Sequence, residues 1–214
     1  MQPPLPHNIF GETFWLSAQR CAFWEAQNAL ILSDLHFGKT GHFRKHGIAV
    51  PQTVFKEDLQ RLVMLIDFFK PTQIIAVGDL FHSNANLELE LFKRWRTDFP
   101  DLAFHLVRGN HDILKKDWYR DAAIDVCEQL QIGNIYFNHE TCTAEANRFS
   151  FCGHLHPGIT LHGMGKQSLR FPCFYFAHDH CILPAFSRFT GMASVQRSSA
   201  ESIYAIVDSA LIKL

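Results

Sequence analysis

Short apolar runs separated by polar, glycine-containing turns make up most of this sequence. Runs of this length, bounded by Gly, Asp, Asn and charged residues, are typical of buried β-strands. The pattern predicts strands at 30–32, 73–77, 102–107, 132–137, 148–152, 170–176, 180–183 and 203–207. Two aromatic runs nearer the N-terminus, 13–16 and 21–24, predict a hairpin that leads into the strand at 30–32.

Two stretches between these runs have apolar residues at helical spacing. We expect Pro51 to open a helix that runs to about Phe69, and we expect a second helix over Asn86–Thr97. Strands and helices therefore alternate up to residue 107, which predicts a βαβ arrangement with right-handed crossovers. Past residue 130 short strands and turns dominate. The sequence thus predicts an α/β fold with two sheets packed face to face and helices outside.

Composition and charge narrow the class of protein. No linker, repeat or low-complexity tract divides the 214 residues, so we expect a single domain over 1–214, with the Pro-rich residues 1–11 as a loosely attached lead-in. A net charge of −1, from 20 Lys and Arg against 21 Asp and Glu, excludes a generally cationic nucleic-acid binder but not a local basic patch.

Targeting signals and cysteine spacing point to the inside of the cell. The N-terminus lacks the charged start and apolar core of a signal peptide, and no apolar stretch reaches the roughly 20 residues that span a bilayer. The six cysteines form no C-x-x-C pair, which favours buried reduced thiols over a zinc ribbon or a disulfide framework. We therefore expect a cytoplasmic protein that does not bind membranes.

Five apolar runs end in side chains that can bind metals. The candidates are Asp34, His36, Asp79, Asn110, His139, His154 and His156. A single Asp-x-His pair is weak evidence, because a capping Asp beside a surface His explains it equally well. No packing requirement explains five repetitions. On an extended or just-turning backbone, residues i and i+2 project to the same side, so we expect Asp34 and His36 to converge beyond the carboxyl end of their strand.

The size and chemistry of this set indicate two metal ions. Seven nitrogen and oxygen donors are too many for one tetrahedral zinc ion, but they suit two ions that share a bridging carboxylate. Imidazole and carboxylate donors suit Mn²⁺, which we expect, as well as Fe or Zn²⁺. Two such ions about 3.5–4 Å apart are a known arrangement for hydrolysing phosphoesters.

Other polar residues are candidates for contacts with the substrate. His111 follows ligand Asn110 and is the candidate general acid, with Asp112 as an orienting partner; alternatively His111 is itself a ligand or an anion-binding donor. Basic residues could bind a substrate phosphate, unless they lie in an ordinary solvated loop or salt bridge. These basic candidates are Lys39, Arg44, Lys45 and Arg170.

The five blocks resemble those of the calcineurin-like metallophosphoesterase superfamily. They are Asp34-Leu35-His36, Gly78-Asp79, Gly109-Asn110-His111-Asp112, Asn138-His139 and Gly153-His154-Leu155-His156. The resemblance implies a four-layer αββα sandwich and a dinuclear centre in which Asp79 is shared. It assigns Asp34, His36 and His156 to one metal, and Asn110, His139 and His154 to the other, with His111 as the catalytic histidine. Many relatives have Glu at 112 and Gly at 138, and neither departure changes a ligand.

A narrower resemblance covers most of the chain. Segments such as Asp34–Lys39, Gly47–Pro51, Gly78–Ser83, Leu169–Phe174 and Leu183–Phe186 are similar to the bacterial ligase-associated metallophosphoesterase family. Membership implies a nuclease or phosphodiesterase in the DNA damage response, with DNA as substrate and association with an ATP-dependent DNA ligase and a DEAD/DEAH-type helicase. The alternatives are a hydrolase of small phosphoesters or nucleotide pyrophosphates, and a binding protein with a vestigial metal site.

Overall fold

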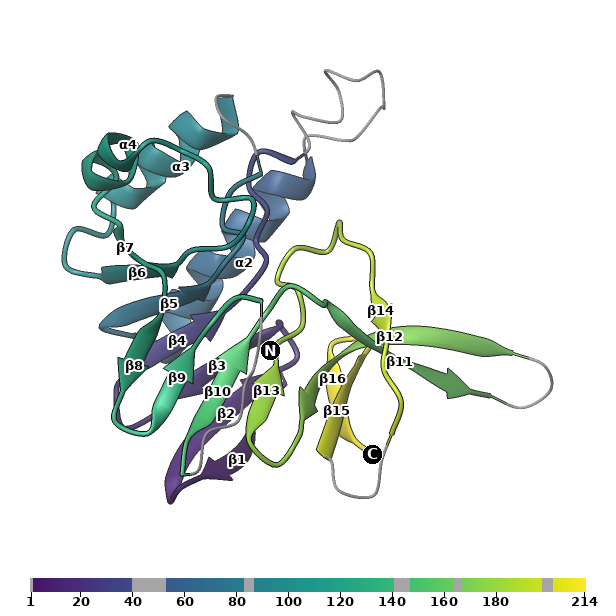
Figure 1. Ribbon diagram of the computed structural model, residues 1–214. Helices are drawn as coiled ribbons and strands as arrows, with labels where there is room; N and C mark the ends of the chain where they lie inside the picture. Colours follow the sequence, from purple (N-terminus) through teal and green to yellow (C-terminus); the bar gives the residue numbers. More distant parts are fainter. Residues whose placement is uncertain (1, 40–52, 83–86, 141–146, 164–166, 198–201) are drawn as a thin grey trace.

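Two β-sheets lie face to face in the computed structural model, with helices on one side of the pair (Figure 1). The structure describes residues 2–39, 53–82, 87–140, 147–163, 167–197 and 202–214. The predicted phosphate-facing residues Arg44 and Lys45 lie outside these ranges. Cys142 lies outside them as well.

The first sheet takes its strands in chain order. They are β1 (Leu5–Ile9), β2 (Glu12–Ser17), β3 (Cys21–Trp24), β4 (Ala29–Leu32), β5 (Gln73–Val77), β6 (Ala103–Val107) and β7 (Asp125–Cys127). Strands β1 to β4 pair in antiparallel fashion, which confirms the predicted hairpin, whereas β4 to β7 pair in parallel. The parallel strands therefore end at the same edge of the sheet.

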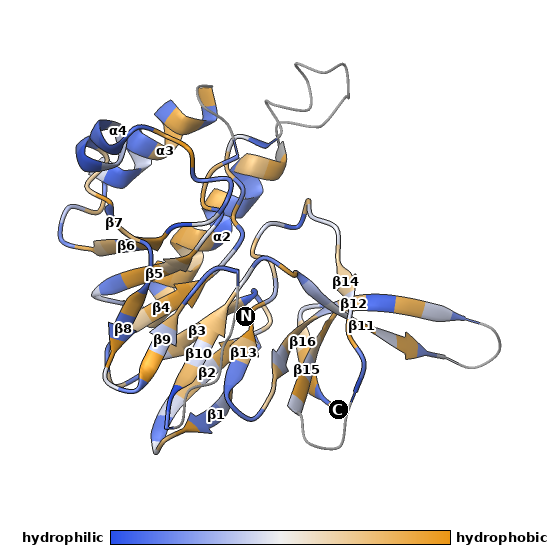
Figure 2. Cartoon of the chain, in the orientation of Figure 1, coloured by the Kyte–Doolittle hydropathy of each residue, from blue (hydrophilic) through white to orange (hydrophobic). Residues whose placement is uncertain are grey.

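Helices α2 (Thr53–Phe69), α3 (Leu87–Thr97) and α4 (Lys116–Asp121) cover the outer face of this sheet. Strand β4 shows how one strand serves two cores: Leu30 and Leu32 pack toward the helices, whereas Ala29 and Ile31 pack toward the second sheet. This alternation arises because successive side chains of a strand point to opposite faces of the sheet, and β4 is buried on both faces. Figure 2 shows that the central strands are apolar. Among the described residues, no helix is both long and apolar enough to cross a membrane.

The second sheet is built from the C-terminal half of the chain. Its strands are β8 (Leu130–Ile132), β9 (Ile135–Phe137), β10 (Phe149–Cys152), β11 (Pro157–His162), β12 (Ser168–Phe176), β13 (His180–Ile182), β14 (Ala193–Ser194), β15 (Ser202–Val207) and β16 (Ala210–Lys213). The spatial order is β14-β11-β12-β13-β10-β9-β8, with β15 also on β12 and β16 on β15. The two mixed sheets confirm the predicted fold class.

Three local predictions are wrong. The strand predicted at 132–137 is two strands, because Gly133 adopts a left-handed φ of 58° and the chain reverses there. Residues 5–9 are not a loose lead-in, since β1 pairs with β2 along its whole length. Cys152 takes part in a disulfide, whereas Cys21, Cys127, Cys173 and Cys181 carry the predicted free thiols.

His7 on β1 shows how firmly the N-terminal strand is attached. Its imidazole stacks on Phe176 of the second sheet, with ring centroids 3.8 Å apart, and Nδ1 lies 2.9 Å from the Tyr204 hydroxyl. Burial, with a smaller effect from the charge of Lys213, lowers the pKa of His7 to about 4. A proton therefore binds the unfolded chain more tightly than the folded one.

We expect His7 to make stability sensitive to acid. The contribution of the neutral His7 to the free energy of unfolding is complete above the unfolded-state pKa of about 6.5, and it is lost as the pH falls toward 4. Urea titrations at pH 7.5 and 4.5 measure this effect. Between these two pH values, the free energy of unfolding should fall by about 1 kcal/mol less in His7→Gln than in the wild type; this figure is reduced because His7 is partly exposed. An equal fall in both proteins would show that the His7 imidazole is not buried in this contact.

Candidate metal centre

The candidate ligands gather where strands of both sheets end. Asp34, Asp79, His139 and His154 each come two residues after a strand, namely β4, β5, β9 and β10. Five of the seven candidates have a left-handed backbone, with φ values between 47° and 64°: Asp34, His36, Asp79, His154 and His156. Such a conformation is uncommon outside glycine, costs on the order of 1–3 kcal/mol per residue, and clusters at functional sites.

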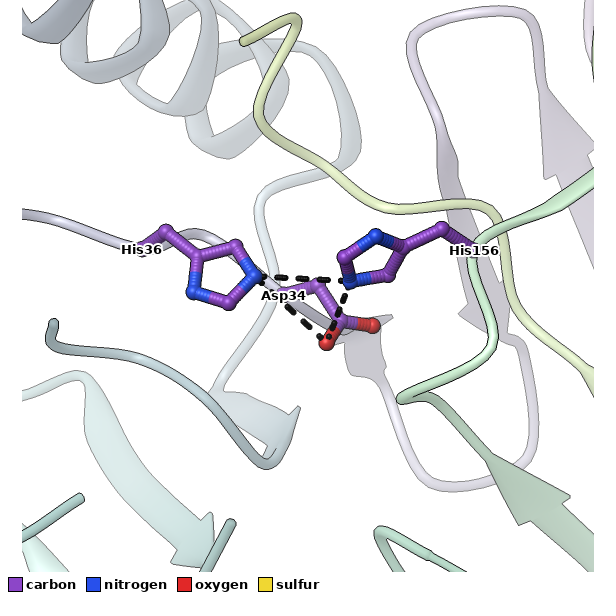
Figure 3. Close-up of side chains that lie close together, drawn as sticks. All are labelled: Asp34, His36 and His156. Atoms are coloured by element: carbon purple, nitrogen blue, oxygen red, sulfur yellow. Dashed lines mark hydrogen bonds and ion pairs between the residues drawn. The ribbon is translucent and has the colours of Figure 1, made fainter. Parts of the chain in front are cut away.

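The first group of ligand atoms comes from Asp34, His36 and His156. Figure 3 shows the carboxylate and the two imidazole rings converging on one point. Nε2 of His156 lies 3.1 Å from Oδ1 of Asp34 and 3.4 Å from Nε2 of His36. Nε2 of His36 lies 3.9 Å from the same carboxylate oxygen. The group is therefore compact enough to surround one ion.

Neighbouring groups fix the orientation of these side chains. Oδ2 of Asp34 accepts the N–H of His154 at 3.1 Å and lies 2.7 Å from the Ser33 hydroxyl, which leaves Oδ1 facing the histidines. The His156 ring lies with Nδ1 3.2 Å from the Gly191 carbonyl, so Nδ1 carries the proton and Nε2 is free to bind. Burial, aided by the charge of Lys39, lowers the pKa of His36 to about 2 and keeps it neutral.

The second group consists of Asp79, His139 and His154. Nε2 of His139 lies 3.3 Å from Oδ2 of Asp79, and the rings of His139 and His154 are 5.3 Å apart. Nδ1 of His139 donates to the Val77 carbonyl at 3.0 Å, so its Nε2 presents a lone pair to the carboxylate. Asn110 lines a cavity of about 360 Å³ together with His139, so this residue lies beside the second group.

Both groups fit metal ions. Burial opposes protonation of His139, but the hydrogen bond and charge of Asp79 outweigh it and raise the pKa of His139 to about 9. Burial likewise opposes ionisation of Asp79, but His139 and the N–H of His111 lower its pKa to about 2. A lone pair facing a buried carboxylate is repulsive unless a cation lies between them. The cation is either a proton on His139 or a metal ion that replaces it.

Glycines make room for the ligands. A Cβ atom at Gly78 would lie 2.0 Å from Nδ1 of His139, and one at Gly153 would lie 1.9 Å from the Ser33 hydroxyl oxygen. Gly78 also has a φ of 78°. The glycines that precede ligands in the sequence are therefore required by close approach, and at Gly78 by backbone conformation as well.

His111 lies at the exposed side of the second group. Its Nε2 is 4.0 Å from Oδ2 of Asp79, and its side chain is 42% exposed. Its ring centroid is 4.2 Å from that of His82 and 5.6 Å from that of His36. His82 therefore lies inside the site, with its ring centroid also 5.5 Å from that of His36. His111 can reach both the ligands and a substrate in the opening.

Asp112 has a different position from the one predicted. Its buried carboxylate accepts the N–H groups of Gly109 at 2.9 Å and Phe81 at 3.0 Å, and burial raises its pKa to about 7 against these bonds. No hydrogen bond to the His111 imidazole occurs among those of the described residues. Asp112 therefore holds the backbone around Asn110 rather than orienting His111 directly.

The predicted cations separate into two environments. Lys39 lines a cavity with His36, and burial lowers its pKa although the charges of Asp34 and Asp79 raise it. Arg170 lies on β12, where Nη1 donates to the Met192 carbonyl at 3.2 Å. Lys39 is thus next to the first ligand group, whereas Arg170 contacts the segment that supports His156.

Comparison with known proteins decides the family. The sequence model of the calcineurin-like phosphoesterase family matches residues 28–181. The chain belongs to this family. As a calcineurin-like phosphoesterase it is a hydrolase of phosphoester bonds, from a family that uses a dinuclear metal centre, and its two ligand groups agree with that centre.

Solved structures similar to this phosphoesterase include a nuclease. The crystal structure of Pseudomonas putida nuclease MPE has 28% sequence identity and a TM-score of 0.84, covering 99% of this chain and 100% of that one. YfcE, a phosphoesterase from E. coli, has 13% sequence identity and a TM-score of 0.44, and the match covers 87% of this chain and 97% of YfcE. A predicted phosphoesterase from Streptococcus pneumoniae has 14% sequence identity and a TM-score of 0.31, and the match covers 86% of each chain. No curated protein sequence matches the phosphoesterase significantly.

Some contributors to the site were missed in the sequence. Ser33 contacts both the Asp34 carboxylate and the Val77 carbonyl, and its place directly before Asp34 at a strand end is a usable signal. The Gly191 carbonyl, which orients His156, is 35 residues away and gives no local signal.

Proposed function

We propose that this phosphoesterase is a phosphodiesterase that cleaves nucleic acid strands with two divalent metal ions. The observation that carries the proposal is its likeness to Pseudomonas putida nuclease MPE over 99% of the chain, at 28% identity. An open site supports it: His111 and His154 are exposed, so a long substrate can approach. Turnover restricted to small phosphoesters would replace this proposal.

The proposed ligand sets share Asp79. Asp34, His36, Asp79 and His156 would hold one ion, and Asp79, Asn110, His139 and His154 would hold the other. Asp79 suits a bridge because His36 and His139 both interact electrostatically with its carboxylate. The donors are nitrogen and oxygen without thiolate, which favours Mn²⁺ over softer metals. Binding releases the proton of His139, so metal affinity should rise with pH up to about 9.

The chain's own residues divide the remaining work. When bound, the ions supply charge neutralisation on the phosphoryl oxygens and an activated water. Ser33, Val77 and Gly191 hold the ligand side chains in place. His111 is exposed, and its Nε2 lies 4.0 Å from Oδ2 of Asp79; from this Nε2 it donates a proton to the leaving oxygen of the substrate. Lys39 adds positive charge beside the first group and attracts the phosphate.

The proposal includes a cellular setting taken from the narrower family resemblance. It places the protein in the cytoplasm, in the bacterial DNA damage response, together with an ATP-dependent DNA ligase and a DEAD/DEAH-type helicase. Arg44 would join Lys39 in binding substrate phosphates. Deleting the gene should raise sensitivity to DNA-damaging agents, and unchanged survival would remove this part of the proposal.

A substrate panel tests the activity. Mn²⁺-loaded protein should hydrolyse bis(p-nitrophenyl) phosphate and cleave at least one of single-stranded, duplex or nicked DNA. Chelation with EDTA should abolish both activities, and added Mn²⁺ should restore them. Hydrolysis of the small ester with all DNA forms intact would keep the chemistry and move the substrate to small phosphoesters.

The His111→Ala variant tests the proton donor. An alkoxide leaving group in DNA needs a proton, whereas p-nitrophenolate leaves without one, so the two substrates should respond differently. We expect DNA cleavage to fall by about 10²–10⁴-fold and p-nitrophenyl ester hydrolysis by much less. An equal loss on both substrates would show that His111 acts only on the structure or on metal binding.

A further inference from the structure

Three arginines crowd the segment that follows β13 and supports the first ligand group. Arg20 and Arg61 interact electrostatically with each other and with Arg188. Burial, followed by the charges of Arg61 and Arg188, lowers the pKa of Arg20 to about 10. Asp58 is the carboxylate that pairs with this cluster, through Nη2 of Arg61 at 3.0 Å. The cluster therefore has an excess of positive charge in a chain whose net charge is −1.

The donors of the cluster are only partly used. Arg61 is buried between Asp58 and the Phe186 carbonyl. Nη1 of Arg20 donates to the carbonyls of Ala185 at 3.1 Å and Ser187 at 2.8 Å. Among the described residues, Nε and Nη2 of Arg20 and the whole guanidinium of the exposed Arg188 have no hydrogen-bond partner. A guanidinium fork of this kind matches the oxygens of a phosphate group.

The free donors line a cavity beside a metal ligand. Arg20, Arg188 and His156 line the same small cavity, about 50 Å³ in volume. A neighbouring cavity of about 190 Å³ shares Arg20 and Arg188 and adds Arg61, with Asp208 also in its lining. Arg20 and Arg188 thus line both cavities, and the first cavity reaches the candidate ligand His156.

We propose that Arg20 and Arg188 form a subsite for a phosphate of the nucleic acid strand next to the one that is cleaved. This inference rests on the proposed function and names how that site would hold a polymer rather than a small ester. A nucleic acid strand whose scissile phosphate lies at the metal ions must continue in both directions. In one of these directions, the next phosphate would meet the arginines that line the cavity beside His156. A small phosphodiester has no second phosphate to place there.

Arg188→Gln is the variant that tests the subsite. The guanidinium of Arg188 makes no hydrogen bond among the described residues, and the backbone N–H of Arg188, which bonds the Asp58 carboxylate, stays in the variant. Loss of the guanidinium should therefore not unfold the protein, whereas the guanidinium of Arg20 also holds backbone carbonyls. Arg120→Gln is the matched control, because it removes the same charge from an exposed residue of α4 whose ion pair among the described residues is with Asp117.

Binding decides the proposal independently of catalysis. Anisotropy of a labelled single-stranded phosphorothioate oligonucleotide on Mn²⁺-loaded protein should show about tenfold weaker binding for Arg188→Gln. The slope of log affinity against log salt should fall by about 0.7, the value for one strand phosphate. Arg120→Gln should match the wild type. Equal affinity of the two variants would overturn the subsite, as would a wild type that binds no oligonucleotide at low salt.

Cleavage locates the phosphate. A single neutral methylphosphonate, placed in turn at each linkage beside the cleaved one, should raise KM at one position by about tenfold in the wild type and by less than twofold in Arg188→Gln. The same tenfold penalty in both proteins would overturn the assignment. If the wild type hydrolysed no phosphodiester at all, the proposed function would fail while the binding data still decided the subsite.

Discussion

Replacing Asp79 with asparagine is expected to lower kcat/KM for phosphodiester hydrolysis by about 10³-fold or more. The loss follows from the proposed role of Asp79 as the carboxylate shared by the two ligand groups: its Oδ2 lies 3.3 Å from Nε2 of His139, and it interacts electrostatically with His36. A metal ion supplies several kcal/mol of transition-state stabilisation, and about 4 kcal/mol corresponds to a thousandfold in rate. Asparagine keeps the size of the side chain but removes the charge.

The matched control for this variant is Asp121→Asn. The side chain of Asp121 is 55% exposed, and within the part of the chain that the structure describes its ion pair is with Lys93, at 3.4 Å. It should keep wild-type activity on bis(p-nitrophenyl) phosphate, and both variants should show the circular dichroism spectrum of the wild type. Activity of Asp79→Asn within tenfold of the wild type would contradict the shared role of this carboxylate.

Gly78→Ala is expected to disable the site although the variant keeps every candidate ligand residue. The new Cβ would lie 2.0 Å from Nδ1 of His139, the atom that donates to the Val77 carbonyl, so the imidazole must move. The backbone at 78 also has a φ of 78°. Together these effects should cost about 2–4 kcal/mol in the free energy of unfolding and remove most of the activity.

A second glycine separates the two causes. Gly11 has a similar φ of 81°, but a Cβ there would meet nothing within 4 Å. Gly11→Ala should therefore lose only about 1 kcal/mol of stability from backbone strain and should keep full activity. Urea titration and Mn²⁺-dependent hydrolysis measure both quantities. Equal losses in the two variants would mean that backbone strain, and not the contact with His139, explains the Gly78 effect.

The positions of the candidate ligands at strand ends were predictable, but the reason for their convergence was not. Parallel strands β4, β5 and β6 could be recognised from their apolar runs, and their polar ends must meet at one edge of the sheet. The expectation for Asp34 and His36 relied on a nearly extended backbone. The structure instead uses left-handed φ values of 56° and 51° at these residues. Tertiary hydrogen bonds from their N–H groups to the Gly78 and Asp79 carbonyls hold that conformation.

Contacts between distant segments account for what the sequence did not reveal. The Asp112 carboxylate turns toward the N–H of Phe81, 31 residues earlier, instead of toward its neighbour His111. Arg20 lies in a turn between two strands and meets the backbone of Ser187, 167 residues later. Neither pairing has a local pattern. The first joins the segments that follow the neighbouring strands β5 and β6 of the first sheet, and the second joins the first sheet to the segment after β13 of the second sheet.

The number of metal ions bound per chain tests the central claim most directly. Metal-free protein would be titrated with Mn²⁺, dialysed and assayed for bound manganese and for phosphodiester hydrolysis in the same samples. The account predicts two ions per wild-type chain, activity that follows their binding, and loss of at least one ion in Asp79→Asn. A wild-type chain that is fully active with one bound ion or none would contradict it.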